Sequence, residues 1–299
     1  MFIIKHKTIF LLISALFVLS SIVGVVVFGF KVGIDFKGGT QAEVAYINEM
    51  PEIKEIQEKV DSLNFGYSLI QPIGEKSIYV KTKDLSEDQR QTLISALKFE
   101  DKYEIEERSF TSIGPSVGKE LKNKSIISLS LVAIMIILFI AYAFRKVSKP
   151  VSSWKYGIIA IITLLHDVIL TIGVFALLSH FTSVEADTLF VVALLTVLGL
   201  SVNDTIVVFD RVRENLQRKI SDNFEEIVGK SLNQTLIRSL NTSLSTIVVL
   251  LALFFVGPES TKVFALILAS GMFFGAYSSL FVASPLLVIA NNLQKNNKT

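Results

Sequence analysis

Six stretches of about 20 largely apolar residues divide this sequence, and each is long enough to cross a bilayer as a helix. Approximately, they are Thr8–Phe30, Ile126–Phe144, Gly157–Leu178, Leu189–Phe209, Ser239–Val256 and Val263–Ala283. The mean hydropathy of +0.56 excludes a soluble enzyme, a disordered chain and a collagen-like fibre. We therefore expect a polytopic α-helical membrane protein with six transmembrane helices.

The first apolar stretch follows Lys5 and Lys7, as the apolar part of a secretory signal would. Its run of about 23 residues is longer than the roughly 7–15 of a signal peptide, and it lacks an A-x-A-like cleavage site. We therefore expect it to be retained as a membrane helix.

Basic residues predict the orientation, because lysine and arginine accumulate in cytoplasmic loops. If the N-terminus is cytoplasmic, the segments on that side contain Lys5, Lys7, Arg145, Lys146, Lys149, Lys155, Arg211, Arg213, Arg218, Lys219, Lys230, Arg238, Lys295 and Lys298. The two short outer loops, Ser179–Thr188 and Gly257–Lys262, contain only Lys262. Both termini are therefore predicted to face the cytoplasm.

The segment between the first two spans has the pattern of a small extracytoplasmic α+β domain. Alternating or β-rich stretches predict strands at Gln41–Ile47, Tyr67–Ile73, Ser77–Lys81 and Tyr103–Phe110. Helical spacing predicts helices at Pro51–Leu63 and from Ser86, which forms a capping-box pattern with Gln89, to Leu97. The order β-α-β-β-α-β is that of a ferredoxin-like fold. The expected division is 1–30, 31–124 (the α+β domain), 125–290 (helices 2–6) and 291–299 (the cytoplasmic tail).

Ionisable side chains inside two of the spans are candidates for function, since a charge at the bilayer centre costs roughly 2.5–3.5 kcal/mol. His166 and Asp167 lie near the middle of the third span, and Asp204 follows Asn203 in the fourth. Because His166 and Asp167 point about 100° apart on a helix, we expect each to have its own partner rather than to form a dyad.

The fifth span offers a partner for Asp204. Arg238, Asn241, Thr242 and Ser245 share one helix face, and the axial gap between Asp204 and Arg238 is about 6 Å. An ion pair is therefore geometrically possible. Alternatively, Arg238 extends to the lipid headgroups, Asn203 and the hydroxyls only link helices, and Asp204 is structural.

Several classes of site are not expected. Cysteine is absent and histidine occurs three times, so neither a Cys-ligated nor a multi-histidine metal centre is predicted. No phosphate-binding glycine motif and no nucleophile–base constellation is present, so we expect no cofactor and no enzymatic activity. The net charge of +2 gives no reason to expect nucleic acid. Gly271 and Gly275 predict a close helix crossing.

Five motifs, in order, make the chain similar to the SecF branch of the SecD/SecF family of bacterial protein-export subunits. They are the segment 32–40 with Gly33, Asp35, Phe36, Gly38 and Gly39; the segment 113–118; Leu165-His166-Asp167; the segment 201–211; and the segment 238–243. The resemblance covers nearly the whole chain.

This resemblance implies a proton-driven accessory to protein export in the bacterial cytoplasmic (inner) membrane. The implied partners are SecD, the SecYEG translocon with its ATPase SecA, the exported unfolded polypeptide and membrane lipid. The six spans would form half of a resistance-nodulation-division (RND) transporter. Asp204 and Arg238 match the family's proton-pathway carboxylate and arginine, and the candidate pathway also includes Asn203, His166 and Asp167.

Two other functions share some of these features. A small-molecule proton antiporter of the RND type has the same six-span unit, but its domain after the first span is normally about three times longer. A membrane scaffold would need no titrating group and would tolerate Asp204→Asn.

Overall fold

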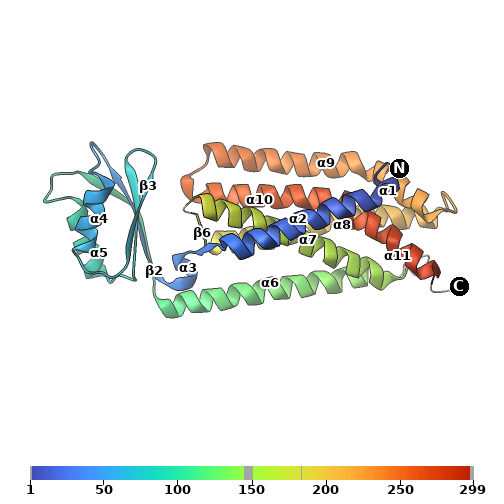
Figure 1. Ribbon diagram of the computed structural model, residues 1–299, viewed down its shortest axis with the longest axis horizontal. Coiled ribbons are helices and arrows are strands. Elements are labelled where there is room, and N and C mark those ends of the chain that lie inside the picture. Colours follow the sequence, from blue (N-terminus) through green and yellow to red (C-terminus); the bar gives the residue numbers. More distant parts are fainter. Residues whose placement is uncertain (1, 145–150, 183, 297–299) are drawn as a thin grey trace. The chain divides into compact units, whose positions relative to one another are not determined.

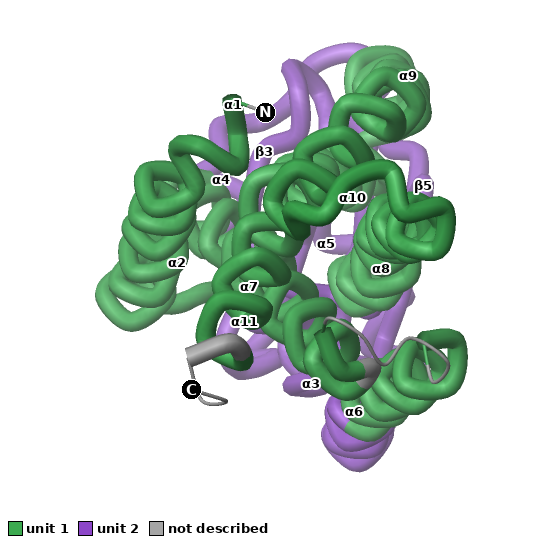
Figure 2. Tube along the Cα trace, turned by 90° about the vertical axis from the view of Figure 1, so that its right-hand side faces the viewer, with its two compact units in different colours: residues 1–30, 127–184, 189–299 green, residues 31–126, 185–188 purple. Residues whose placement is uncertain are grey.

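The computed structural model describes residues 2–144, 151–182 and 184–296, which form two compact units. Unit 1 comprises Met1–Phe30, Ile127–Val184 and Leu189–Thr299, and unit 2 comprises Lys31–Ile126 and Glu185–Thr188 (Figure 2). Of the basic residues that predict the orientation, Arg145, Lys146, Lys149 and Lys298 lie outside the described residues.

Unit 1 is a bundle of long helices that run alongside one another (Figure 1). Its elements are α1 (Phe2–Lys5), α2 (Lys7–Phe28), α6 (Pro115–Ala143, of which the first part belongs to unit 2), α7 (Ser153–Phe181), α8 (Thr188–Gln217), α9 (Phe224–Val256), α10 (Glu259–Ser278), η1 (Ser279–Ala283) and α11 (Ser284–Asn296). Six helical segments in the described part of the chain are long and apolar enough to cross a membrane. The chain is thus a multi-pass membrane protein, as its apolar stretches predict.

Most of these helices extend beyond the apolar stretches that predict them. Helix α8 continues eight residues past Phe209, and α9 begins fifteen residues before Ser239. The extensions carry ion pairs along the helix, such as Arg211 to Glu214. Hydropathy detects only the part of a helix that lies at lipid depth, whereas backbone hydrogen bonding continues into the polar surroundings.

Helices α7, α8 and α10 form the centre of unit 1. In their most apolar windows more than half of the residues are buried, compared with 17% or less for α2, α6 and α9. Gly271 and Gly275 of α10 let α8 approach closely, because a Cβ added at these positions would meet Val197 and Ser201. The predicted helix crossing is confirmed. Past Ser278 the final span changes to the π-helix η1, a local form that often occurs at functional sites.

Unit 2 contains a four-stranded antiparallel sheet with two helices on one face (Figure 1). Its elements are β2 (Gly39–Tyr46), α4 (Ile53–Asp61), β3 (Ser68–Ile73), β4 (Ser77–Thr82), α5 (Glu87–Leu97) and β5 (Ile105–Ile113), with the spatial strand order β3-β4-β2-β5. Alternate residues of the strands pack against α4 and α5 in one apolar core. The capping box of Ser86 and Gln89 is present at the start of α5, as predicted.

Three shorter elements complete unit 2. Strand β1 (Lys31–Val32) pairs in parallel with β6 (Glu185–Ala186), and the single turn α3 (Ile34–Lys37) follows β1. The positions of the apolar stretches predict a plain outer loop at residues 179–188. They give no indication that the end of this loop joins unit 2. A two-residue strand has no detectable periodicity, so only its distant partner reveals it.

Candidate functional site

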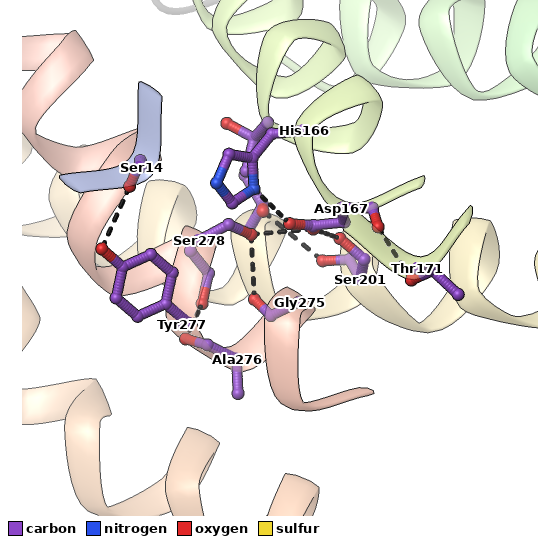
Figure 3. Close-up of polar contacts among 12 residues, drawn as sticks. Ser14, His166, Asp167, Thr171, Ser201, Gly275, Ala276, Tyr277 and Ser278 are labelled. Atoms are coloured by element: carbon purple, nitrogen blue, oxygen red, sulfur yellow. Dashed lines mark hydrogen bonds and ion pairs between the residues drawn. The ribbon is translucent and has the colours of Figure 1, made fainter. Parts of the chain in front are cut away.

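A buried polar cluster lies at the centre of unit 1 around Asp167, whose side chain is completely buried. Its Oδ2 atom accepts hydrogen bonds from the hydroxyls of Ser201, at 2.5 Å, and Ser278, at 2.7 Å (Figure 3). Its Oδ1 atom lies 2.9 Å from Nδ1 of His166. The carboxylate therefore has three partners from three helices, α7, α8 and α10. We call these four residues the Asp167 cluster.

The contact between His166 and Asp167 contradicts the expectation that these neighbours would each have a separate partner. Their Cβ atoms do point about 100° apart on α7, but the side-chain torsions turn the Asp167 carboxylate back towards the ring. The angle between the two Cβ directions therefore does not prevent an imidazole and a neighbouring carboxylate from making contact.

The second ring nitrogen of His166, Nε2, is buried and has no hydrogen-bond partner among the described residues. The ring stacks on Tyr277, with 6.2 Å between centroids, and the Tyr277 hydroxyl lies 3.0 Å from the hydroxyl of Ser14 on α2 (Figure 3). When Nδ1 donates to Asp167, Nε2 of the neutral ring carries an unused acceptor lone pair.

Asp204 forms a second polar centre, with fewer hydrogen bonds than the carboxylate of the Asp167 cluster. Its residue is 7% exposed, and its Oδ2 atom accepts a hydrogen bond of 3.0 Å from Ser243 of α9. Ser239, one turn earlier on the same face of α9, has a buried hydroxyl without a hydrogen-bond partner among the described residues. Asp204 thus has a single hydrogen bond among the described residues, and α9 presents an unpaired hydroxyl one turn away from its donor.

Arg238 does not form the ion pair with Asp204 that the axial spacing permits. Among the residues that the structure describes, no cation lies within 4.0 Å of the Asp204 carboxylate, and Arg238 is exposed on α9. The axial estimate neglects the rotation about the helix: Ser243, five residues after Arg238, faces Asp204, so Arg238 lies about 140° away from that face.

The remaining polar residues of this region lie on the outside of unit 1. Asn203 is exposed on α8, and Asn241, Thr242 and Ser245 are exposed with Arg238 on α9. The structure thus separates the predicted proton-pathway residues into a buried set, His166, Asp167 and Asp204, and an exposed set, Asn203 and Arg238. The exposed set on α8 and α9 is called the polar face below.

The family-signature residues after the first span, Gly33, Asp35, Phe36, Gly38 and Gly39, belong to unit 2 and not to the polar centres of unit 1. No group of three or more His, Cys, Asp or Glu side chains that could hold a metal ion occurs in the described ranges.

Sequence reasoning did not assign a role to the three serines that hold the carboxylates. Ser201, Ser243 and Ser278 are common residues in membrane helices and carry no charge that would single them out. Ser201 and Ser243 do lie within the motif segments 201–211 and 238–243, whereas Ser278 lies in none of the five motifs.

Comparisons with known proteins identify the family. Residues 93–293 match the family model described as protein export membrane protein SecD/SecF, C-terminal. The SecF protein translocase subunit of Thermobaculum terrenum is 40% identical over 302 residues, covering 97% of this chain and 94% of that protein. The SecF subunit of Synechocystis is 38% identical, covering 86% of this chain and 82% of that protein.

A solved structure agrees with the sequence matches. The crystal structure of SecDF from Thermus thermophilus, a translocon-associated membrane protein, has a TM-score of 0.82 and 29% identity to this chain. The match covers 97% of this chain and 38% of the SecDF chain, so this protein corresponds to a little over a third of SecDF. The chain belongs to the SecF protein translocase subunits of the SecD/SecF family.

Proposed function

We propose that this chain acts in the Sec translocase as an accessory subunit that uses the proton-motive force, with Asp204 as the group that gains and loses the proton. The observation that carries the proposal is the placement of Asp204 in a membrane helix, almost buried, with one serine as its hydrogen-bond donor and no cation nearby among the described residues. A carboxylate at that depth must be neutral, paired or hydrated.

The Asp167 cluster has the opposite character and is assigned a supporting role. Its carboxyl group has three hydrogen-bond partners and no exposed surface, which favours one stable arrangement. Its link to Asp204 runs along α8, where Ser201 and Asp204 are three residues apart on neighbouring positions of one helix face. His166 and Asp167 therefore hold the helix that carries the titrating group.

A SecD subunit is proposed to cover the polar face. Asn203 lies within the fourth apolar stretch and Arg238 directly before the fifth, and both are exposed on membrane helices. Exposed polar side chains at or near lipid depth are stable only against protein or water. In the SecDF chain of Thermus thermophilus more than half of the polypeptide lies outside the part that this chain matches, and this remainder is the model for the partner. SecD contact can bring Arg238 towards Asp204, or supply another cation.

Other parts of the proposal concern the domains, the location and the further partners. We assign unit 2 to a ferredoxin-like extracytoplasmic domain, which its element order and its strand order β3-β4-β2-β5 support. The proposed division remains 1–30, 31–124, 125–290 and 291–299. The proposed location is the bacterial inner membrane with both termini in the cytoplasm, and the further partners are SecYEG, SecA and the exported polypeptide.

The experiment compares Asp204→Asn with Asp210→Asn in vesicles that contain SecD and the translocon. Asp210 lies six residues further along α8, is exposed and pairs with Arg213, so its substitution controls for the loss of a carboxylate on this helix. Export is measured with and without a proton gradient. We expect the gradient to stimulate export by Asp210→Asn as by the wild type, and to have no effect with Asp204→Asn. Full stimulation with Asp204→Asn, in a complex that still contains SecD, refutes the proposal.

A further inference from the structure

The family-signature segment after the first span contacts the start of α8. The Oδ2 atom of Asp35 accepts hydrogen bonds from the backbone N of Thr188, at 2.8 Å, and from its hydroxyl, at 2.6 Å. Thr188 is the first residue of α8, and the N–H of a first helical residue has no acceptor within its own helix. Asp35 thus caps a helix that begins 153 residues later in the sequence.

A second set of contacts holds the same loop. Strand β1 pairs with β6 just before α8, and the backbone N of Gly33 donates to the carbonyl of Ala186 at 2.8 Å. A Cβ on Gly33 would lie 3.0 Å from that carbonyl oxygen, so the close approach favours glycine. Lys81 of β4, only 8% exposed, forms an ion pair of 3.0 Å with Glu185. The loop is therefore tied to the sheet of unit 2 as well as to the signature segment.

These contacts all lie within unit 2, whereas α8 continues from Thr188 into unit 1. We propose that Asp35, the β1–β6 pair and the Lys81–Glu185 ion pair form a clamp that makes the start of α8 move with unit 2. Helix α8 carries Ser201 of the Asp167 cluster and Asp204. Asp35 is a positioning residue, since it acts on Asp204 through the helix.

The inference rests on the proposed function and extends it. A protonation change at Asp204 can drive movement of the extracytoplasmic domain only if a stiff element links the two, and a capped helix is such an element. The clamp supplies that link at the one loop of unit 2 that leads directly into α8.

The first test measures backbone hydrogen exchange at residues 188–191 in the complex with SecD. Because a lost side-chain cap typically destabilises a helix start by about 1 kcal/mol, exchange is expected to be about fivefold faster in Asp35→Ala. Thr188→Val, which loses the hydroxyl but keeps the backbone N–H, should show a smaller increase. Asp101→Asn, an exposed position of unit 2, is the matched control and should not change.

The second test asks whether a covalent link replaces Asp35. Residues 32 and 186 are direct partners in the β1–β6 pair, so their Cα atoms are about 5 Å apart and suit a disulfide. The native sequence has no cysteine, so Val32→Cys with Ala186→Cys forms a single defined bond. In an Asp35→Ala background we expect gradient-stimulated export to be lost when the pair is reduced and restored when it is oxidised.

The outcomes separate this inference from the proposed function. Unchanged exchange at residues 188–191 in Asp35→Ala, or export that stays lost after oxidation, overturns the clamp. Gradient-stimulated export that persists with Asp204→Asn overturns the proposed function instead, and the exchange measurement still decides whether Asp35 holds α8.

Discussion

The carboxylate of Asp167 and the hydroxyl of Ser278 lie 2.7 Å apart although 111 positions separate them in the sequence. Ser278 is the last residue of α10 before the π-helix η1, so the hydrogen bond lies at the point where the final span changes its backbone pattern. Ser201 donates to the same oxygen atom from α8. One buried carboxylate thereby holds the three central helices of unit 1 together.

The Asp167 cluster predicts a graded loss of stability. Asp167→Leu leaves the hydroxyls of Ser201 and Ser278 and the His166 ring without their acceptor, and we expect it to destabilise unit 1 by about 3 kcal/mol or more. Asp167→Asn keeps one acceptor oxygen and should be less harmful. Thermal unfolding of the purified complex in detergent measures both variants. Equal stability of Asp167→Leu and wild type would mean that the cluster does not hold the helices.

The crossing of α8 and α10 predicts a steric effect at Gly271. Gly271→Ala places a methyl group against Val197 and should lower the unfolding temperature, because overpacking in a tight interface typically costs about 1–3 kcal/mol. Gly157→Ala on α7 is the matched control, since no heavy atom lies within 4 Å of its added Cβ. There the higher helix propensity of alanine should leave stability unchanged or slightly raised. Thermal unfolding that ranks the two variants in the reverse order contradicts this crossing.

Arg238 is predicted to act through its charge in the complex with SecD. Arg238→Lys keeps the positive charge but loses the planar guanidinium, whereas Arg238→Met keeps only the length of the side chain. Gradient-stimulated export should therefore be reduced partly in the first variant and almost completely in the second. If Arg238 only extends to lipid headgroups, both variants should export as the wild type does, and the measurement in vesicles with and without a proton gradient decides between these outcomes.

Tyr46 predicts an alkaline limit to the stability of unit 2. Burial in the sheet core, with a smaller contribution from nearby Tyr103, raises the pKa of the Tyr46 hydroxyl well above its usual value. The folded state therefore disfavours the ionised form, so stability is fully present below the unfolded pKa of about 10 and falls as the pH rises above it.

Tyr46→Phe tests this dependence. The variant loses the hydrogen bond from the hydroxyl to the Leu97 carbonyl, so we expect it to be about 1 kcal/mol less stable at pH 7. It also lacks the ionisable group, so the difference from wild type should shrink above pH ~10. Proteolysis of unit 2 in increasing urea, at pH 7 and above pH ~10, measures the stability difference between the variant and the wild type. Tyr67→Phe at an exposed position is the control. A stability difference between Tyr46→Phe and the wild type that grows with pH contradicts the raised pKa of Tyr46.

The elements that the sequence predicts well are those encoded by local patterns. The six spans follow from the length of the apolar runs, and the order of strands and helices in unit 2 follows from periodicities of 2 and 3.6 residues. The Ser86 capping box joins residues only three positions apart. His166, Asp167 and Asp204 are recognisable as candidates because an ionisable side chain is unfavourable in an apolar helix.

Tertiary structure alone decided which side chains these candidates meet. Sequence spacing gives the depth of Arg238 and Ser243 in the membrane, but the rotation of α9 against α8 determines that Ser243 contacts Asp204. The bonds from Ser278 to Asp167 and from Thr188 to Asp35 join residues far apart in the chain. Such pairings depend on how whole helices and loops pack against one another. Packing results from many weak contacts between distant segments, so it leaves no periodic signal in any one segment.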